Sequence, residues 1–82
     1  MNDWRLQGQE TYLIGAIMTF IHYRPYRAGW DHDHCEFCGT KFSLANEDLH
    51  EGYATENHYH WTCKPCFDDF VDMFQWKVVP PK

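Results

Sequence analysis

The sequence predicts a small α+β domain, and three observations support this prediction. All four cysteines fall within residues 35–66, as two Cys-x-x-Cys pairs with 24 residues between them. Between the pairs, short runs of alternating polar and aromatic residues are typical of strands. Directly after the second pair, apolar residues recur at helical spacing. Paired cysteines at this separation also indicate a tetrahedral four-thiolate zinc site.

The cysteine spacing predicts the metal ligands and their local structure. The four predicted ligands of one structural Zn²⁺ ion are Cys35, Cys38, Cys63 and Cys66. Gly39 follows the first pair and can adopt the positive φ that a tight turn requires. Pro65 suits the first turn of a helix that should end near Gln75. Because four thiolates leave zinc no open position for water, the sequence predicts no catalytic residue.

The order of these motifs resembles a known zinc-binding fold. A Cys-x-x-Cys-Gly turn, a hairpin and a Cys-x-x-Cys that opens a helix resemble the treble-clef zinc finger. The resemblance implies a zinc module over about residues 31–76, within a single zinc-stabilised domain of residues 1–82.

The second strand of the hairpin shows a period of two. Tyr59 and Trp61 are expected to face the core, while His58 and His60 lie on the opposite face. A solvated histidine pair is the simple interpretation of that face. Together with His50, the pair could also supply the ligands of a second metal site.

Disulfides are the alternative use of four cysteines in a short chain. Met1 leads into a largely polar segment that reaches Glu10, rather than into the apolar run of a secretory leader. The sequence therefore predicts reduced, metal-binding cysteines in a cytoplasmic protein.

Residues 12–22 contain no Lys, Arg, Asp or Glu. Leu13, Ile17 and Phe20 fall on one helical stripe, which predicts an N-terminal apolar helix over about residues 9–23. A strand is the alternative, because Ile, Thr, Phe and Tyr favour sheets and Gly15 weakens a helix by about 1 kcal/mol. The run is shorter than the roughly 20 residues of a membrane span, so no membrane association is predicted.

Charge is unevenly distributed along the chain. The net charge is −5, and residues 31–72 hold ten of the twelve acidic residues against two lysines. Nucleic-acid binding depends on Lys and Arg that displace counterions, so this composition disfavours nucleic acid as a partner. A basic protein surface suits the acidic segment better. Arg24 and Arg27 are expected to form ion pairs with it.

The Asp-His-Asp-His string that ends just before Cys35 is the strongest catalytic signal. It resembles a string found in some His-Asn-His endonucleases, although there the string lies between the cysteine pairs. A metal-dependent nuclease that uses His32, His34 and His58 is therefore one alternative function, and a nucleic-acid-binding zinc finger is another. The simpler interpretation is that His32 and His34 hydrogen-bond to thiolates or backbone carbonyls around the turn.

Three strings, at residues 30–38, 50–55 and 59–70, resemble a group of small uncharacterised bacterial proteins. The resemblance covers most of the chain and implies a bacterial source, without an assigned activity. Some small acidic bacterial proteins are immunity proteins that block a cognate toxin, which is an analogy of size and charge.

The preferred interpretation is therefore a zinc-stabilised module that binds another protein or a second copy of itself. Residues 12–26 offer more apolar surface than a small core can cover, and exposed apolar surface marks interaction sites. The acidic residues expected to assist are Asp68, Asp69 and Asp72.

Overall fold

The computed structural model describes residues 3–81 and shows a small α+β domain with a mixed sheet, a separate hairpin and a C-terminal helix. In chain order the elements are α1 (Glu10–Leu13), β1 (Ile17–His22), β2 (His32–His34), β3 (Lys41–Ser43), β4 (Glu51–Thr55), β5 (Trp61–Thr62), α2 (Lys64–Phe74) and β6 (Lys77–Val78). The four-stranded sheet has the order β5-β4-β1-β6, while β2 and β3 form the hairpin.

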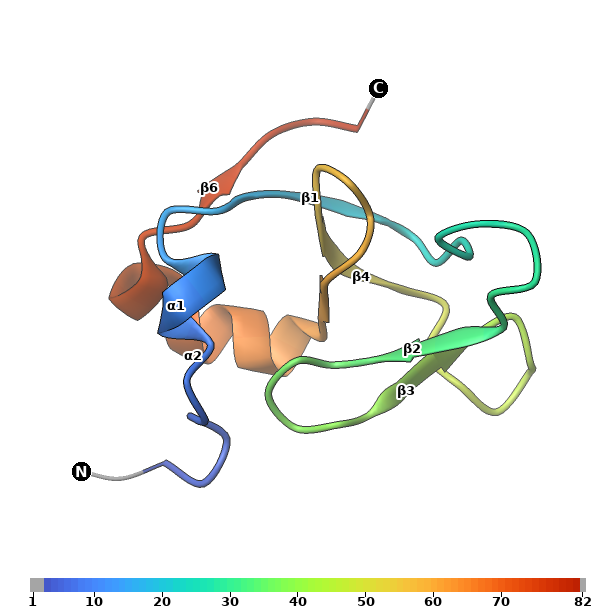
Figure 1. Cartoon of the computed structure of the whole chain (residues 1–82), viewed down its shortest axis with the longest axis horizontal. Helices are drawn as coiled ribbons and strands as arrows, with labels where there is room; N and C mark the ends of the chain where they lie inside the picture. The colour runs from blue at the N-terminus through green and yellow to red at the C-terminus, as the bar shows by residue number, and fades with distance from the viewer. Residues whose placement is uncertain (1–2, 82) are drawn as a thin grey trace.

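Strand β1 lies in the middle of the sheet. It pairs antiparallel with β4, with Phe20 opposite Tyr53, and parallel with β6, with Met18 opposite Val78. Both edges of β1 are hydrogen-bonded and its Met18 is fully buried, so this strand joins β4 and β6 into one sheet and contributes to the core. Figure 1 shows it running across the molecule above α2.

The prediction of an N-terminal apolar helix over residues 9–23 is wrong. Only Glu10–Leu13 are helical, and the chain turns at Gly15, whose φ of +73° suits glycine. A strand with neighbours on both edges and side chains packed on both faces reads as a continuous apolar run. Periodicity alone does not separate such a strand from a buried helix, and here the β-forming residues decide the outcome.

The predicted C-terminal helix is confirmed. Pro65 lies in the first turn of α2, and the helix ends at Gln75, which has a left-handed φ of 58°. The buried face consists of Cys66, Phe67, Phe70 and Phe74. Phe67 stacks on Tyr53 of β4 with ring centroids 3.6 Å apart, so the helix packs directly against the sheet.

The hairpin strand predicted around residues 58–62 is shorter than expected. Strand β5 contains only Trp61 and Thr62, because His58 has a φ of 62° and turns the chain just before it. Trp61 is fully buried, as predicted. Tyr59 is 41% exposed, so its predicted place in the core is wrong.

Gly52 provides a test of this packing. A Cβ atom there would lie 2.7 Å from Cε1 of the buried Phe42 ring and 3.0 Å from the Thr62 carbonyl oxygen. We expect Gly52→Ala to lower the free energy of unfolding by about 1–3 kcal/mol, the usual cost of overpacking a core. Urea denaturation of the metal-loaded protein measures this, with the neighbouring exposed substitution Glu51→Ala as the control. Equal stability of the two variants would contradict the packing described here.

Candidate metal centre

The four cysteines converge on one point of the structure. All four are free thiols, and their Sγ atoms all lie within 4.8 Å of one another. The Sγ atoms of Cys38 and Cys63 are 3.6 Å apart. Thiolates around a tetrahedral zinc ion, at about 2.3 Å from it, lie about 3.8 Å from each other. The four cysteines are therefore placed to hold one metal ion.

Two structural elements bring the cysteines together. The β2–β3 turn carries Cys35 and Cys38, and the start of α2 carries Cys63 and Cys66. Figure 1 shows this turn pointing toward the first residues of the helix. Gly39 closes the turn with a φ of +79°, as its position after the first pair predicted. The backbone amide of Glu36 also donates to the Trp61 carbonyl at 2.9 Å, which joins the turn to the sheet.

Two backbone amides donate to the sulfur atom of Cys35. The amides of Phe37 and Cys63 both lie 3.4 Å from Cys35 Sγ and donate to it. Backbone N–H donors of this kind are typical of the surroundings of a metal-binding cysteine sulfur.

Burial favours the protonated form of the free thiols. It raises the pKa of Cys63, and it raises the pKa of Cys66 to about 11. For Cys38, burial also favours the protonated form, but hydrogen bonds from the Thr40 amide and from the neighbouring thiols outweigh it and lower the pKa. Bringing four ionised sulfurs together therefore requires a cation, and metal binding must release protons.

Arg5 is the residue of this site that the sequence analysis missed. Its Nη1 lies 3.5 Å from Cys66 Sγ and 3.0 Å from Asp69 Oδ2, while its Nη2 lies 2.7 Å from Asp3 Oδ2. The guanidinium also stacks over the Phe70 ring at 4.5 Å. Hydrogen bonds from Arg5 lower the pKa of Asp3 to about 2. The segment before α1 thus supplies a cation to a thiolate of the cluster.

Gln9 attaches the same segment to the metal-binding turn. Its side chain is buried, and its Nε2 donates to the carbonyl oxygens of Arg5 and Glu36, both at 2.8 Å. The N-terminal segment is therefore attached to both parts of the site, to α2 through Arg5 and to the turn through Gln9.

The predicted role of the two histidines before the turn is confirmed in part. Nδ1 of His34 lies 3.0 Å from the carbonyl oxygen of Gly39, within the metal-binding turn. Nδ1 of His32 instead contacts Asp31 Oδ1 at 2.9 Å. Neither ring contacts a cysteine sulfur among the described residues.

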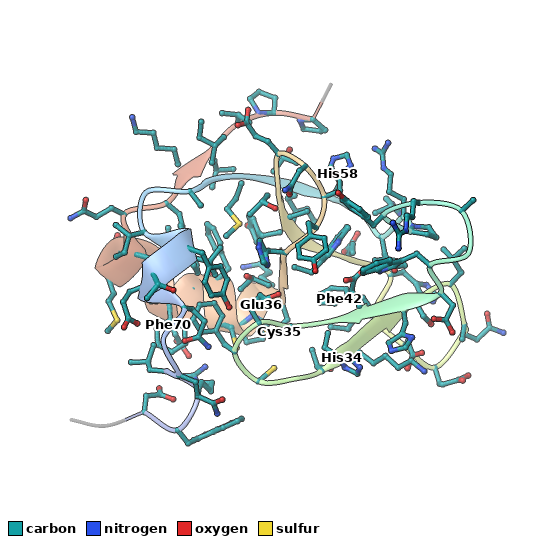
Figure 2. All side chains as sticks on the ribbon, in the orientation of Figure 1. His34, Cys35, Glu36, Phe42, His58 and Phe70 are labelled. Atoms are coloured by element: carbon teal, nitrogen blue, oxygen red, sulfur yellow. The ribbon has the colours of Figure 1, made fainter. Side chains whose placement is uncertain are left out.

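The other histidines lie in different surroundings. Nδ1 of His60 lies 3.0 Å from Glu36 Oε2, and Nε2 of His50 lies 2.7 Å from the Ala45 carbonyl oxygen. Burial and nearby Arg24 lower the pKa of His58. His58 and His34 point away from each other on opposite sides of Figure 2.

Neither predicted histidine cluster is assembled. Over residues 3–81, the structure gathers no group of three or more potential metal ligands other than the cysteines. The hypothetical second site of His50, His58 and His60 is therefore not brought together, and the same holds for the His32, His34 and His58 set of the nuclease alternative.

The prediction that Arg24 and Arg27 pair with the acidic segment is wrong. Within the described part of the chain, neither guanidinium lies within 4 Å of a carboxylate. Arg27 instead lies over the Trp30 ring, 5.5 Å from its centroid. Arg5 instead pairs with the acidic segment, through Asp69, and also with Asp3.

Comparisons with protein-family models, with curated proteins and with solved structures gave no match for this chain. The resemblance to small bacterial proteins therefore has no identified family behind it, and the cysteine cluster is the part of it that the structure supports. In the described residues, no helix combines the length and apolar character needed to cross a membrane.

The contact between Arg5 and Cys66 predicts how firmly the metal is held. Arg5→Met removes the charge and the N–H···S bond but keeps an apolar chain over Phe70. We expect the metal affinity to fall about 10–100-fold, as is usual when a partner of a metal ligand is lost. Competition with a chromogenic chelator measures the affinity.

Arg27→Met is the matched control, because Arg27 is exposed and has no contact with the cluster. Equal metal affinities of the two variants would show that Arg5 does not support the site.

Proposed function

We propose that this protein is a small zinc finger of the treble-clef type, in which a structural Cys₄ site holds a surface for binding another protein. Two features support the metal part of the proposal: the four sulfurs lie within 4.8 Å of one another, and they come from a hairpin turn and the start of a helix. Soft thiolate ligands in this arrangement select zinc over magnesium or calcium.

The proposal predicts one zinc ion per chain. Protein purified under reducing conditions should contain zinc at a 1:1 ratio, measured by elemental analysis. A mercurial reagent should release it as four thiols are titrated. Because the cysteine thiols must lose their protons to bind zinc, the affinity for zinc should fall as the pH falls. A metal content near zero in fresh reduced protein, or two disulfides by mass, would contradict this prediction.

The surface that supports the binding role is a row of aromatic rings. We call it the aromatic ridge; its members are Tyr12, Tyr26, Trp30, Tyr59 and His60. Neighbouring rings lie 4.8 to 5.8 Å apart between centroids. The three tyrosines are 41–49% exposed. Tyr, Trp and Arg are the residues that dominate the energy of protein interfaces, and Arg27 extends the ridge at Trp30.

The ridge is held in place from beneath. Trp30 Nε1 donates to Asp33 Oδ2 at 2.9 Å, and that oxygen also accepts from Tyr23. At the other end, Tyr12 donates to Glu36 Oε1 at 2.8 Å. Burial and this contact raise the pKa of Tyr12 to about 12. Fixed rings lose little conformational entropy on binding, so they suit a contact surface.

The contact surface that we propose differs from the one predicted from residues 12–26. Phe20 is 36% exposed and packs on Tyr53 of the sheet, so it belongs partly to the core. Asp68 and Asp69 are engaged with Lys64 and Arg5. The proposed contact surface keeps Tyr12 and Tyr26 from that stretch and adds rings from the loops around residues 30 and 59.

The net charge of −5 indicates the chemistry of the partner. An acidic protein associates faster with a basic surface, while the apolar centre of an interface determines how long the complex lasts. We therefore propose a basic protein partner, of which a toxin bound by an immunity-type protein is one case. Self-association through the ridge, nuclease activity and nucleic-acid binding are the competing outcomes.

Tyr59→Ala tests the aromatic ridge, because its ring contacts three other members. We expect this variant to keep its zinc and its fold but to lose more than about tenfold in affinity for the partner. Quantitative capture from bacterial lysate, with bound proteins compared by mass spectrometry, measures the loss. Sedimentation equilibrium measures any self-association in the same way.

Leu44→Ala is the control, since Leu44 is 69% exposed and lies outside the ridge. If the wild-type protein, Tyr59→Ala and Leu44→Ala all captured the partner equally well, the aromatic ridge would not be the binding surface. Metal-dependent cleavage of nucleic acid by the wild-type protein that disappears in His32→Ala would contradict the binding function itself.

A further inference from the structure

We propose that His32 and His34 form a second metal site, distinct from the cysteine cluster, that takes a transition-metal dication such as Zn²⁺, Ni²⁺ or Cu²⁺. The two residues stand two apart on strand β2, so both side chains lie on the same face. Their ring centroids are 5.0 Å apart with an interplanar angle of 85°. Two imidazoles that share one tetrahedral ion, at about 2.0–2.1 Å from it, have centroids about 5 Å apart.

The hydrogen bonds of the two rings set the tautomer that metal binding needs. Nδ1 of His32 contacts the Asp31 carboxylate at 2.9 Å, and Nδ1 of His34 contacts the Gly39 carbonyl at 3.0 Å. Both partners are acceptors, so in the neutral ring each Nδ1 carries the proton and each Nε2 keeps its lone pair. Metal-binding histidines commonly donate their second nitrogen to a carboxylate or a backbone carbonyl in this way.

The lone pairs are also accessible. Over residues 3–81, neither Nε2 has a hydrogen-bond partner in the protein. His34 is exposed and His32 is half-buried, and Figure 2 shows His34 on the outer edge of the hairpin. A dication from solvent can therefore reach both nitrogens without displacing any contact within the chain.

The strand that carries the pair is held firmly. Asp33, between the two histidines, lies opposite the buried Phe42 and accepts hydrogen bonds from Tyr23 and Trp30. Lys41 lies opposite His34 in the register, and its Nζ lies 3.8 Å from Asp48 Oδ2, so an acidic partner offsets its charge. The negative charge of Asp31 adjoins His32, so the local charge favours a cation.

The cysteine cluster needs neither histidine, because four sulfurs already complete a tetrahedral site. The pair supplies two ligands, and water or a donor from another molecule takes the other positions. Imidazole nitrogens favour zinc, nickel and copper over magnesium and calcium. The proposal is therefore independent of the binding function argued above.

Titration of the zinc-loaded protein with Ni²⁺, with binding measured by isothermal titration calorimetry, tests the proposal. We expect one additional ion per chain and no release of the first zinc, which a colorimetric indicator reports in the same sample. His32→Ala and His34→Ala should each weaken Ni²⁺ binding at least tenfold. Asp31→Ala should weaken it about 10–100-fold, since it removes the partner of a ligand. Circular dichroism checks that each variant keeps its fold.

His22→Ala is the matched control, because His22 is an exposed histidine on another strand. In the wild-type protein, NMR of the imidazole nitrogens should show both rings as Nδ1–H tautomers, with Nε2 shifted on addition of Zn²⁺. Ni²⁺ binding that is equally tight in His34→Ala, or equally weakened by His22→Ala, would overturn the proposal. So would an Nε2–H tautomer at either histidine.

Discussion

The convergence of four cysteine sulfurs within 4.8 Å is the constraint on which the rest of the structure depends. Ionised sulfurs this close repel one another, so the arrangement requires a cation at its centre. A core of this size rarely supplies more than about 3–5 kcal/mol, whereas structural zinc contributes apparent free energies of about 10–16 kcal/mol in small finger peptides. We therefore expect the attraction between the sulfurs and a cation to stabilise the contact between the hairpin turn and the start of α2 more than the surrounding apolar packing does.

The N-terminal segment belongs to the same unit as the metal centre. Arg5 places a guanidinium against a cysteine sulfur and an aromatic ring, and the buried Gln9 amide bonds the segment to the metal-binding turn. The contacts of Arg5 join residues about 60 positions apart in the sequence. As a result, the positive charge of Arg5 partly neutralises the acidic segment of residues 31–72 next to the cysteine cluster.

The sequence by itself determined the parts of the protein that depend on neighbouring residues. The spacing of the cysteines predicted the cluster that could hold a metal ion, Gly39 predicted the turn, and Pro65 followed by apolar residues at helical spacing predicted α2. Each of these features rests on local backbone geometry or on a period that is visible within a dozen residues. For that reason the convergence of the four cysteines was predicted from the sequence, whereas the contacts of Arg5 and Gln9 with the cluster were not.

Only the tertiary structure decided what depends on distant contacts. Residues 17–22 became a strand because β4 and β6 pair with its two edges, and the apolar run itself was compatible with a helix. Tyr59 lies outside the core because His58, in a left-handed conformation, turns the chain just before it. Arg5 was indistinguishable from Arg24 in the sequence, since the pairing of a charge is fixed by which side chains the fold brings within reach, and local sequence carries no record of that.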